Sequence, residues 1–196
     1  MTTRDVRRGI SLCMLTFAML VGAAASARAQ VFVSPFIGYD FGGDAKCPAI
    51  TNCEDKYVNA GASIGLMGAL VGWEEEFGYA RDFFGDAPGF SSSMLTLMSN
   101  FMIVPDLGPV RPYALAGVGL MKTHVEFKSS SVFTATDNHF GWDVGGGVMA
   151  LFSEHVGVRG DLRYFHAFND FKLLGLALGD TKLDFGRVSG AAVFVF

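Results

Sequence analysis

The feature that most constrains the fold is a strict alternation of residue character over residues 156–165. Apolar or aromatic residues and one glycine occupy the even-numbered positions, whereas Arg159, Asp161 and Arg163 occupy odd-numbered ones. Because successive side chains of a β-strand point to opposite faces, this period of two predicts a strand with one apolar and one charged face. A chain built from such strands must place the two faces in different surroundings.

The same period recurs along the chain, and turn residues separate its segments. We expect eight strands at about 31–41, 57–67, 70–83, 92–104, 110–125, 140–151, 156–165 and 187–196. Short turns at 68–69, 106–109 and 153–155 alternate with long polar connections at roughly 42–56, 84–91, 126–139 and 166–182. Short and long connections in alternation are typical of an up-and-down antiparallel barrel that crosses a membrane.

A soluble β-sandwich would show the same alternation, so the outer face of the strands has to decide between the two folds. The predicted strands lack a polar outer face, and no run after the N-terminus reaches the length of a membrane-spanning helix. Aromatic residues also gather near the predicted short turns, as in the interfacial girdles of membrane barrels. These residues are Trp73, Tyr113, Trp142, Phe152, Phe194 and Phe196. The predicted fold class is therefore all-β, an eight-stranded antiparallel up-and-down transmembrane β-barrel.

The N-terminus has the pattern of a secretory signal peptide. Basic residues begin it, an apolar stretch spans 10–25, and Ala27-Arg28-Ala29 supplies a small-x-small cleavage site. A transmembrane anchor would need about 20 apolar residues and no such site. We expect residues 1–29 to be a cleaved signal peptide and residues 30–196 to form the barrel domain.

The charge balance disfavours a nucleic-acid partner. The chain has 15 basic and 19 acidic residues, and loss of the signal peptide would leave a net charge of about −7. Binding to phosphates requires clustered Lys and Arg, and the sequence contains no such run.

Two cysteines, Cys47 and Cys53, remain after removal of Cys13 with the signal peptide. In an exported, oxidising setting this pair predicts a disulfide that closes a short loop. By the chain-entropy estimate it would contribute about 2 kcal/mol. A structural zinc site is the rival interpretation, but it needs about four Cys or His ligands and no His lies near the pair. We therefore expect neither a metal site nor a cofactor.

If the apolar faces meet lipid, a set of charged residues must point into the barrel. These are Glu74, Glu76, Asp143, Arg159, Asp161, Arg163 and Arg187. An eight-stranded barrel is only wide enough for its own side chains to fill. We expect these groups to form a paired network that plugs the interior; the alternative is a narrow ion path or gate lined by the same residues.

Glu75 departs from this pattern, because it lies between two acids that are expected to point inward. Its own side chain must then point outward. Three explanations remain open: a position near the membrane interface, a β-bulge that rotates it, or a protonated carboxyl in lipid.

Two segments match known catalytic or phosphate-binding motifs but lack the secondary structure that those motifs require. Residues 61–65 match the G-x-S-x-G nucleophile elbow around Ser63, but the motif requires a following helix and here the strand continues. The glycines at 117, 119 and 145–147 lie in predicted strands, where they make room for bulky neighbours. His124 and Glu126 share a strand face and keep open a lipid-modifying enzyme, although a solvated strand end is the simpler interpretation. We expect no catalytic residues.

Several segments carry a resemblance to a known family. They are VFVSPFIGYDFGG, VRPYALAGVGL, FGWDVGGGVMALF, VGVRGDLRYF and the closing VFVF. Their order and spacing resemble the small outer-membrane β-barrel proteins of the OmpA/OmpX (porin-like) type. The resemblance implies an integral protein of the bacterial outer membrane, surrounded by lipid and lipopolysaccharide. It also implies that the barrel-assembly machinery recognises the C-terminal strand through Phe194 and Phe196.

The function expected from this scaffold is structural and surface-interacting, because loops held on a rigid framework are where binding residues concentrate. The sequence identifies no ligand for the loops. A narrow porin-type channel for ions or small solutes is the alternative, and a lipid-modifying enzyme is a more distant one.

Overall fold

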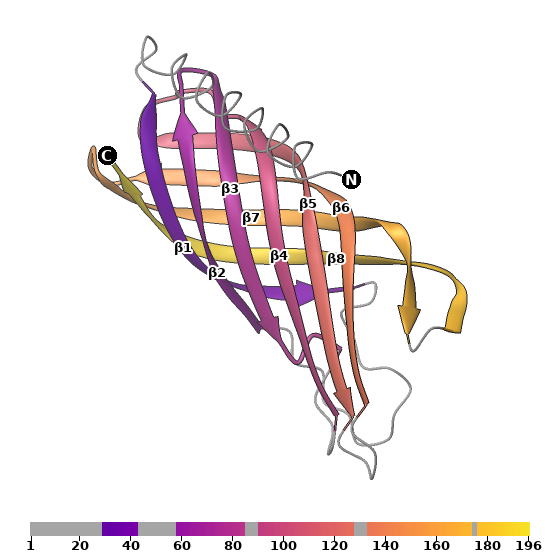
Figure 1. Cartoon of the computed structure of the whole chain (residues 1–196). Helices are drawn as coiled ribbons and strands as arrows, with labels where there is room; N and C mark the ends of the chain where they lie inside the picture. Colours follow the sequence, from indigo (N-terminus) through magenta and orange to yellow (C-terminus); the bar gives the residue numbers. More distant parts are fainter. Residues whose placement is uncertain (1–28, 43–57, 85–89, 128–132, 174–175) are drawn as a thin grey trace, which may run out of the picture.

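The computed structural model describes residues 29–42, 58–84, 90–127, 133–173 and 176–196. The strands are β1 (Gln30–Phe41), β2 (Val58–Met67), β3 (Val71–Arg81), β4 (Phe90–Ile103), β5 (Val110–Phe127), β6 (Phe133–Leu151), β7 (Val156–Leu173) and β8 (Leu176–Val195). Each strand pairs antiparallel with the next, and β1 pairs with β8, so the sheet closes into a barrel (Figure 1). The predicted fold class is confirmed. The Cys47–Cys53 pair and the predicted signal peptide, apart from Ala29, lie outside the described residues.

The barrel closes where the first strand, β1, pairs with the last strand, β8. Phe32 pairs with Val195, and the backbone N–H of Phe196 donates to the carbonyl of Val31 at 2.8 Å. Because the strand number is even, the start of β1 and the end of β8 lie at the same end of the barrel. This is the end that carries the short turns.

Short turns join β2 to β3, β4 to β5 and β6 to β7, as the sequence predicts. In the second of these, Gly108 has a φ of 88°, a conformation that favours glycine, and its N–H donates to Asp106 Oδ1 at 3.1 Å. In the third, Ser153 Oγ accepts from the N–H of Val156 at 3.1 Å. Local hydrogen bonds therefore hold these two turns.

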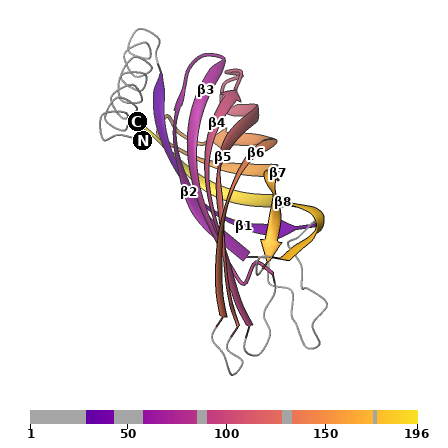
Figure 2. The same ribbon diagram turned by 45° about the vertical axis from the view of Figure 1, so that its right-hand side comes forward.

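The later strands are longer than the sequence indicates, and the long connections predicted at 126–139 and 166–182 are wrong. Most of these residues continue β5 to β8, with Phe127 paired to Phe133 and Leu173 paired to Leu176. The extensions run past the barrel wall (Figure 1) and remain visible from the side (Figure 2). The reason is physical: an antiparallel ladder is held by backbone hydrogen bonds, so it can continue where the sequence no longer alternates between apolar and polar residues.

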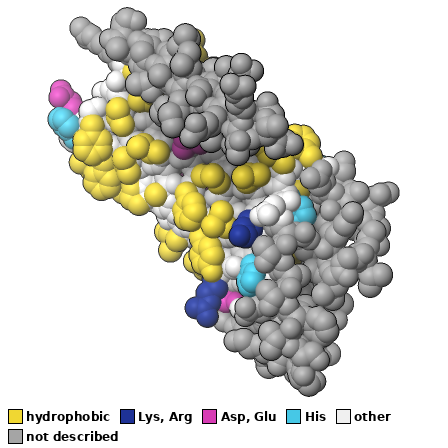
Figure 3. Space-filling view, viewed as in Figure 1, with side chains coloured by type: hydrophobic (Ala, Val, Ile, Leu, Met, Phe, Trp, Pro, Cys, Tyr) yellow, Lys and Arg dark blue, Asp and Glu magenta, His cyan; other side chains and the backbone are white. Residues whose placement is uncertain are grey.

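The outward side of the barrel is an apolar belt. Large apolar side chains on every strand are exposed there, among them Ile37, Phe77, Leu120 and Leu162. Apolar side chains cover the part of the wall seen in Figure 3. A continuous belt of this kind exceeds the apolar patches found on soluble monomers and requires an apolar medium.

The interior has three layers along the barrel axis. At the short-turn end lies an apolar cluster formed by Phe32, Met67, Met102, Val104, Tyr113, Leu115, Met149, Val193 and Val195. At the opposite end lies a second one formed by Ala80, Phe83, Met94, Met98, Met121, Phe165, Ala167, Leu183 and Phe185. Flexible methionines fill much of both clusters, as they do in irregular cores. A charged layer lies between the two.

Among the described residues, no helix is long and apolar enough to cross a membrane.

Candidate functional site

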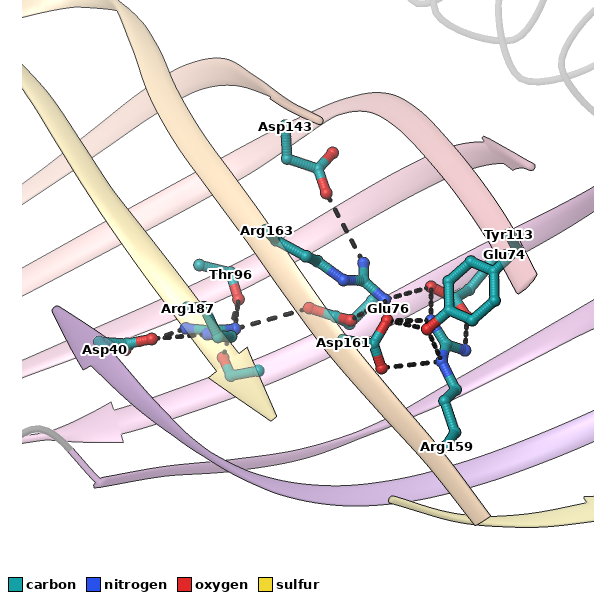
Figure 4. Close-up of polar contacts among 11 residues, drawn as sticks. Asp40, Glu74, Glu76, Thr96, Tyr113, Asp143, Arg159, Asp161, Arg163 and Arg187 are labelled. Carbon is teal, nitrogen blue, oxygen red and sulfur yellow. Dashed lines mark hydrogen bonds and ion pairs between the residues drawn. The ribbon is translucent and has the colours of Figure 1, made fainter. Parts of the chain in front are cut away.

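The charged layer is organised across the diameter of the barrel. In a ring of eight strands, β3 and β7 are four strands apart in either direction and so face each other. Arg163 on β7 reaches Glu74 on β3, with Nη2 at 2.7 Å from Oε1, and Arg159 donates to the same carboxylate (Figure 4). Both guanidiniums are buried. The contact therefore spans the whole lumen.

Arg163 is the hub of this layer. Its Nη2 lies 2.8 Å from Glu76 Oε2 and 3.4 Å from Asp161 Oδ1, and its Nη1 lies 3.6 Å from Asp143 Oδ2. The Asn100 amide, turned so that its nitrogen faces Asp143, donates to that carboxylate at 2.7 Å. Inward-facing Gly145 leaves room for the Arg163 stem, since a Cβ there would lie 2.8 Å from Arg163 Cγ.

Arg159 forms a second, tighter unit with Asp161 and Tyr113. Arg159 Nε donates to Asp161 Oδ2 at 2.8 Å and to the Tyr113 hydroxyl at 2.7 Å, and that hydroxyl donates to Asp161. The guanidinium also lies 4.7 Å from the centre of the Tyr113 ring, within cation–π range. Gly147 faces this ring, and a Cβ there would lie 2.5 Å from the hydroxyl.

Arg187 on β8 links a carboxyl on the neighbouring strand β1 to polar groups on the strands across the lumen. Its Nε donates to Asp40 Oδ1 at 2.7 Å, and its Nη1 contacts Thr96 Oγ1 at 3.3 Å and Glu76 Oε1 at 3.5 Å. Thr96 belongs to β4, which faces β8 across the ring. Asn59 Nδ2 donates to the same Asp40 oxygen at 2.8 Å.

The seven predicted interior residues all lie inside the barrel and are buried, and the ion pairs link all of them into one connected group. Sequence reasoning missed Asp40. A signal was available, because Asp40 shares its parity along β1 with the inward residues Phe32, Ser34 and Phe36. With Asp40, five carboxyls and three guanidiniums meet in the layer.

Two of the expected girdle aromatics lie elsewhere. Tyr113 is 6% exposed and points into the lumen, because the inward side of β5 at that position faces Gly147 and the Arg159 unit. Trp142 lies nine residues before the end of β6 at Leu151, so it is far from the short turns. It contacts Tyr164 and His166 on the outward face instead, with ring centroids at 5.8 and 5.5 Å.

Glu75 points outward. The pairing of β3 with β2 and β4 runs without a register shift at this position, so the bulge explanation is wrong. Glu75 Oε1 accepts from Trp73 Nε1 at 2.9 Å and from Ser99 Oγ at 2.6 Å. The carboxyl is therefore held against the outer wall by its two neighbours.

The structure does not place the two candidate catalytic motifs, at Ser63 and at His124 with Glu126, in an arrangement typical of an active site. Ser63 is buried, faces the lumen and lies in a strand that continues to Met67. His124 lies in β5, while the side chain of Glu126 lies outside the described part of the chain. Among the described residues, no group of three His, Cys, Asp or Glu is placed to hold a metal ion.

Phe194 and Phe196 are exposed on the outward face at the short-turn end.

Comparison with known proteins places this barrel in a family. A family model described as outer membrane protein beta-barrel domain matches residues 11–196. No curated protein matches the chain. The solved structure of Neisserial surface protein A (NspA) has a TM-score of 0.59 and 14% identity, covering 86% of this chain and 97% of that chain.

Two further structures agree with this fold. A major outer membrane protein from Thermus thermophilus has a TM-score of 0.57 and 15% identity, covering 86% of this chain and 99% of that chain. Ail, the attachment invasion locus protein of Yersinia pestis, has a TM-score of 0.54 and 12% identity, covering 87% and 99%. Since the family model covers nearly the whole chain and the barrel shares the fold of these proteins, the chain belongs to the outer-membrane β-barrel family and is an integral protein of the bacterial outer membrane.

Proposed function

We propose that this protein anchors and displays surface-exposed segments for contact with external partners, and that it neither conducts solutes nor catalyses a reaction. The observation that carries the proposal is the layered interior. Arg163 and Arg159 bridge β7 to β3 across the full diameter, and an apolar cluster closes the lumen on each side.

A solute path would have to break this arrangement. An ion entering from either end would first cross a layer of buried apolar side chains, where it would lose its hydration at large cost. It would then have to displace guanidinium–carboxylate contacts of 2.7 to 2.8 Å between buried partners. Separating such a pair leaves uncompensated buried charges, which is strongly unfavourable. A barrel of eight strands supplies no spare width for a water-filled bypass.

The surface role is supported by the shape of the end opposite the short turns. In outer-membrane barrels the short turns lie on the periplasmic side, so this opposite end faces the exterior. There β5 and β6 extend as a paired hairpin arm, with Val125 opposite Ala135. Ail, which shares the fold, is named as an attachment protein. A rigid barrel that carries projecting arms suits a similar task.

The closed lumen can be tested by planar-bilayer recording of the purified, folded protein, with a known open porin as the reference. We expect no stable conductance steps. Reproducible unitary steps that persist at high protein purity would contradict the proposal and favour the porin-type channel.

The display role can be tested by shortening the hairpin arm at its outer end. In the variant, residues 126–134 are replaced by a two-residue Asn-Gly turn, which suits a hairpin closed at the Val125 and Ala135 pair. We expect bacteria carrying the variant to lose adhesion to host-cell or matrix surfaces that the parent strain binds. A folded variant that still adheres like the parent would count against this arm as the binding element. Heat-dependent gel migration checks the folding of the barrel.

A further inference from the structure

The carboxyl of Glu75 lies in the middle of the lipid-facing wall. On the outward side of β3 it is flanked by Trp73 and Phe77, and beyond them by Val71 and Tyr79. With a strand rise of about 3.3 Å per residue and the usual tilt, Glu75 is about 10 Å along the membrane normal from each end of this run. The apolar band of such barrels is about 25 Å tall. Glu75 is therefore near its middle, and the explanation that it lies at the interface does not hold.

The barrel itself satisfies only part of this carboxyl. The hydrogen bonds from Trp73 and Ser99 both end on Oε1. Within the described residues, Oε2 receives no hydrogen bond. An ionisable group in this position is costly in hydrocarbon, and such groups ordinarily pair with another polar group.

The depth of Glu75 restricts what the missing partner can be. At the middle of the bilayer, lipids offer only acyl chains, and water and headgroups are out of reach. Lipid alone could therefore hold this carboxyl only in its protonated form, and a polar partner at this depth would have to be protein. A carboxyl is self-complementary, because two of them can share a hydrogen bond when one carries a proton. A two-fold axis places the same patch of both subunits in contact, which brings the two carboxyls together.

The surrounding wall suits such a contact. Small outward side chains, Ala62 on β2 and Ala116 on β5, lie near Glu75 and Ser99 and allow a second wall to approach closely, as small residues do between membrane helices. Ile64 and Leu97 are exposed beside them and supply apolar contact area.

We propose that the outward face of β2 to β5 is an interface between two copies of this chain in the membrane, with Glu75 and Ser99 near the two-fold axis. Each copy supplies the polar group that the lipid cannot. This places a symmetric dimer, built on the lipid-facing wall, beneath the external arms.

Cysteine crosslinking in native outer membranes tests the interface. The background carries Cys47→Ser and Cys53→Ser. Single cysteines are placed at Ile64 on β2, opposite Glu75, or at Leu97 on β4, opposite Phe77, and at Leu162 on the opposite wall as the control. A disulfide forms only where the two Cα atoms approach within about 7 Å. We expect oxidation to give a dimer band for Ile64→Cys or Leu97→Cys and none for Leu162→Cys.

Adding Glu75→Leu to the crosslinking variant separates the role of the carboxyl from chance collisions. We expect loss of the dimer band with unchanged heat-dependent migration, because leucine suits the lipid-facing wall and leaves the barrel intact. Glu75→Gln, which keeps hydrogen-bonding atoms, should retain the band. Absence of dimers at both Ile64→Cys and Leu97→Cys, a dimer that survives Glu75→Leu, or an equal band at Leu162→Cys would each overturn the proposal.

Discussion

Replacement of Arg163 by methionine removes the charge at the hub of the interior layer while keeping an unbranched apolar stem. Four carboxylates lie within 3.6 Å of the guanidinium. Two of them, Glu74 and Asp161, keep Arg159 as a partner, and Glu76 keeps only a contact of 3.5 Å with Arg187. Among the described residues, Asp143 has no other ion pair.

The variant therefore strands one buried carboxylate and weakens the pairing of a second. Removal of one partner from a buried ion pair costs about 3–5 kcal/mol, and we expect a loss of unfolding free energy in that range. Urea unfolding in lipid vesicles measures it. Both tryptophans lie on the outward face, so their fluorescence reports transfer of the wall from lipid to water.

A double variant provides the control. Arg163→Met combined with Asp143→Asn leaves no stranded charge at position 143, so part of the lost stability should return. Coupling between contacting residues is ordinarily about 0.5–3 kcal/mol, and a value in the upper half is expected. An unchanged urea midpoint for Arg163→Met, or additive effects in the double variant, would refute the reasoning that the network holds the lumen closed.

Two other predictions concern a crowded glycine and the disulfide expected from the sequence. Gly78→Ala would place a methyl group 2.5 Å from Arg187 Nη1, so it should destabilise the barrel by about 1–3 kcal/mol in the same urea assay, whereas Gly160→Ala, which meets nothing within 4 Å, should leave the midpoint unchanged. Equal midpoints for both variants would contradict the crowding argument. Thiol alkylation of the unfolded mature protein should label no cysteine before reduction and two after it if Cys47 and Cys53 form the predicted disulfide; labelling without reductant would show free thiols.

The period of two along each strand predicted the direction of most charged side chains, because this alternation is a local property of an extended backbone. It placed Arg159 and Asp161 in the lumen and Glu75 on the outer wall, and it located the short turns. The ends of the strands were harder to predict from the sequence. Beyond the membrane belt neither face of β5 to β8 has to be apolar, so the alternation that marks a strand disappears while the backbone ladder continues.

The sequence by itself determined the even number of strands and the inward direction of seven of the eight charged residues in the interior layer; it missed Asp40. Only the tertiary structure decided which groups pair. Closure of β1 on β8 sets β3 opposite β7, and this brings Arg163 to Glu74, 89 residues away in the chain. Closure also delivers Asp40 to Arg187 and turns Tyr113 from an expected girdle residue into a partner of Asp161. The physical reason is that the direction of a side chain depends on its position along one strand. The residue it pairs with across the lumen depends on how the whole sheet closes.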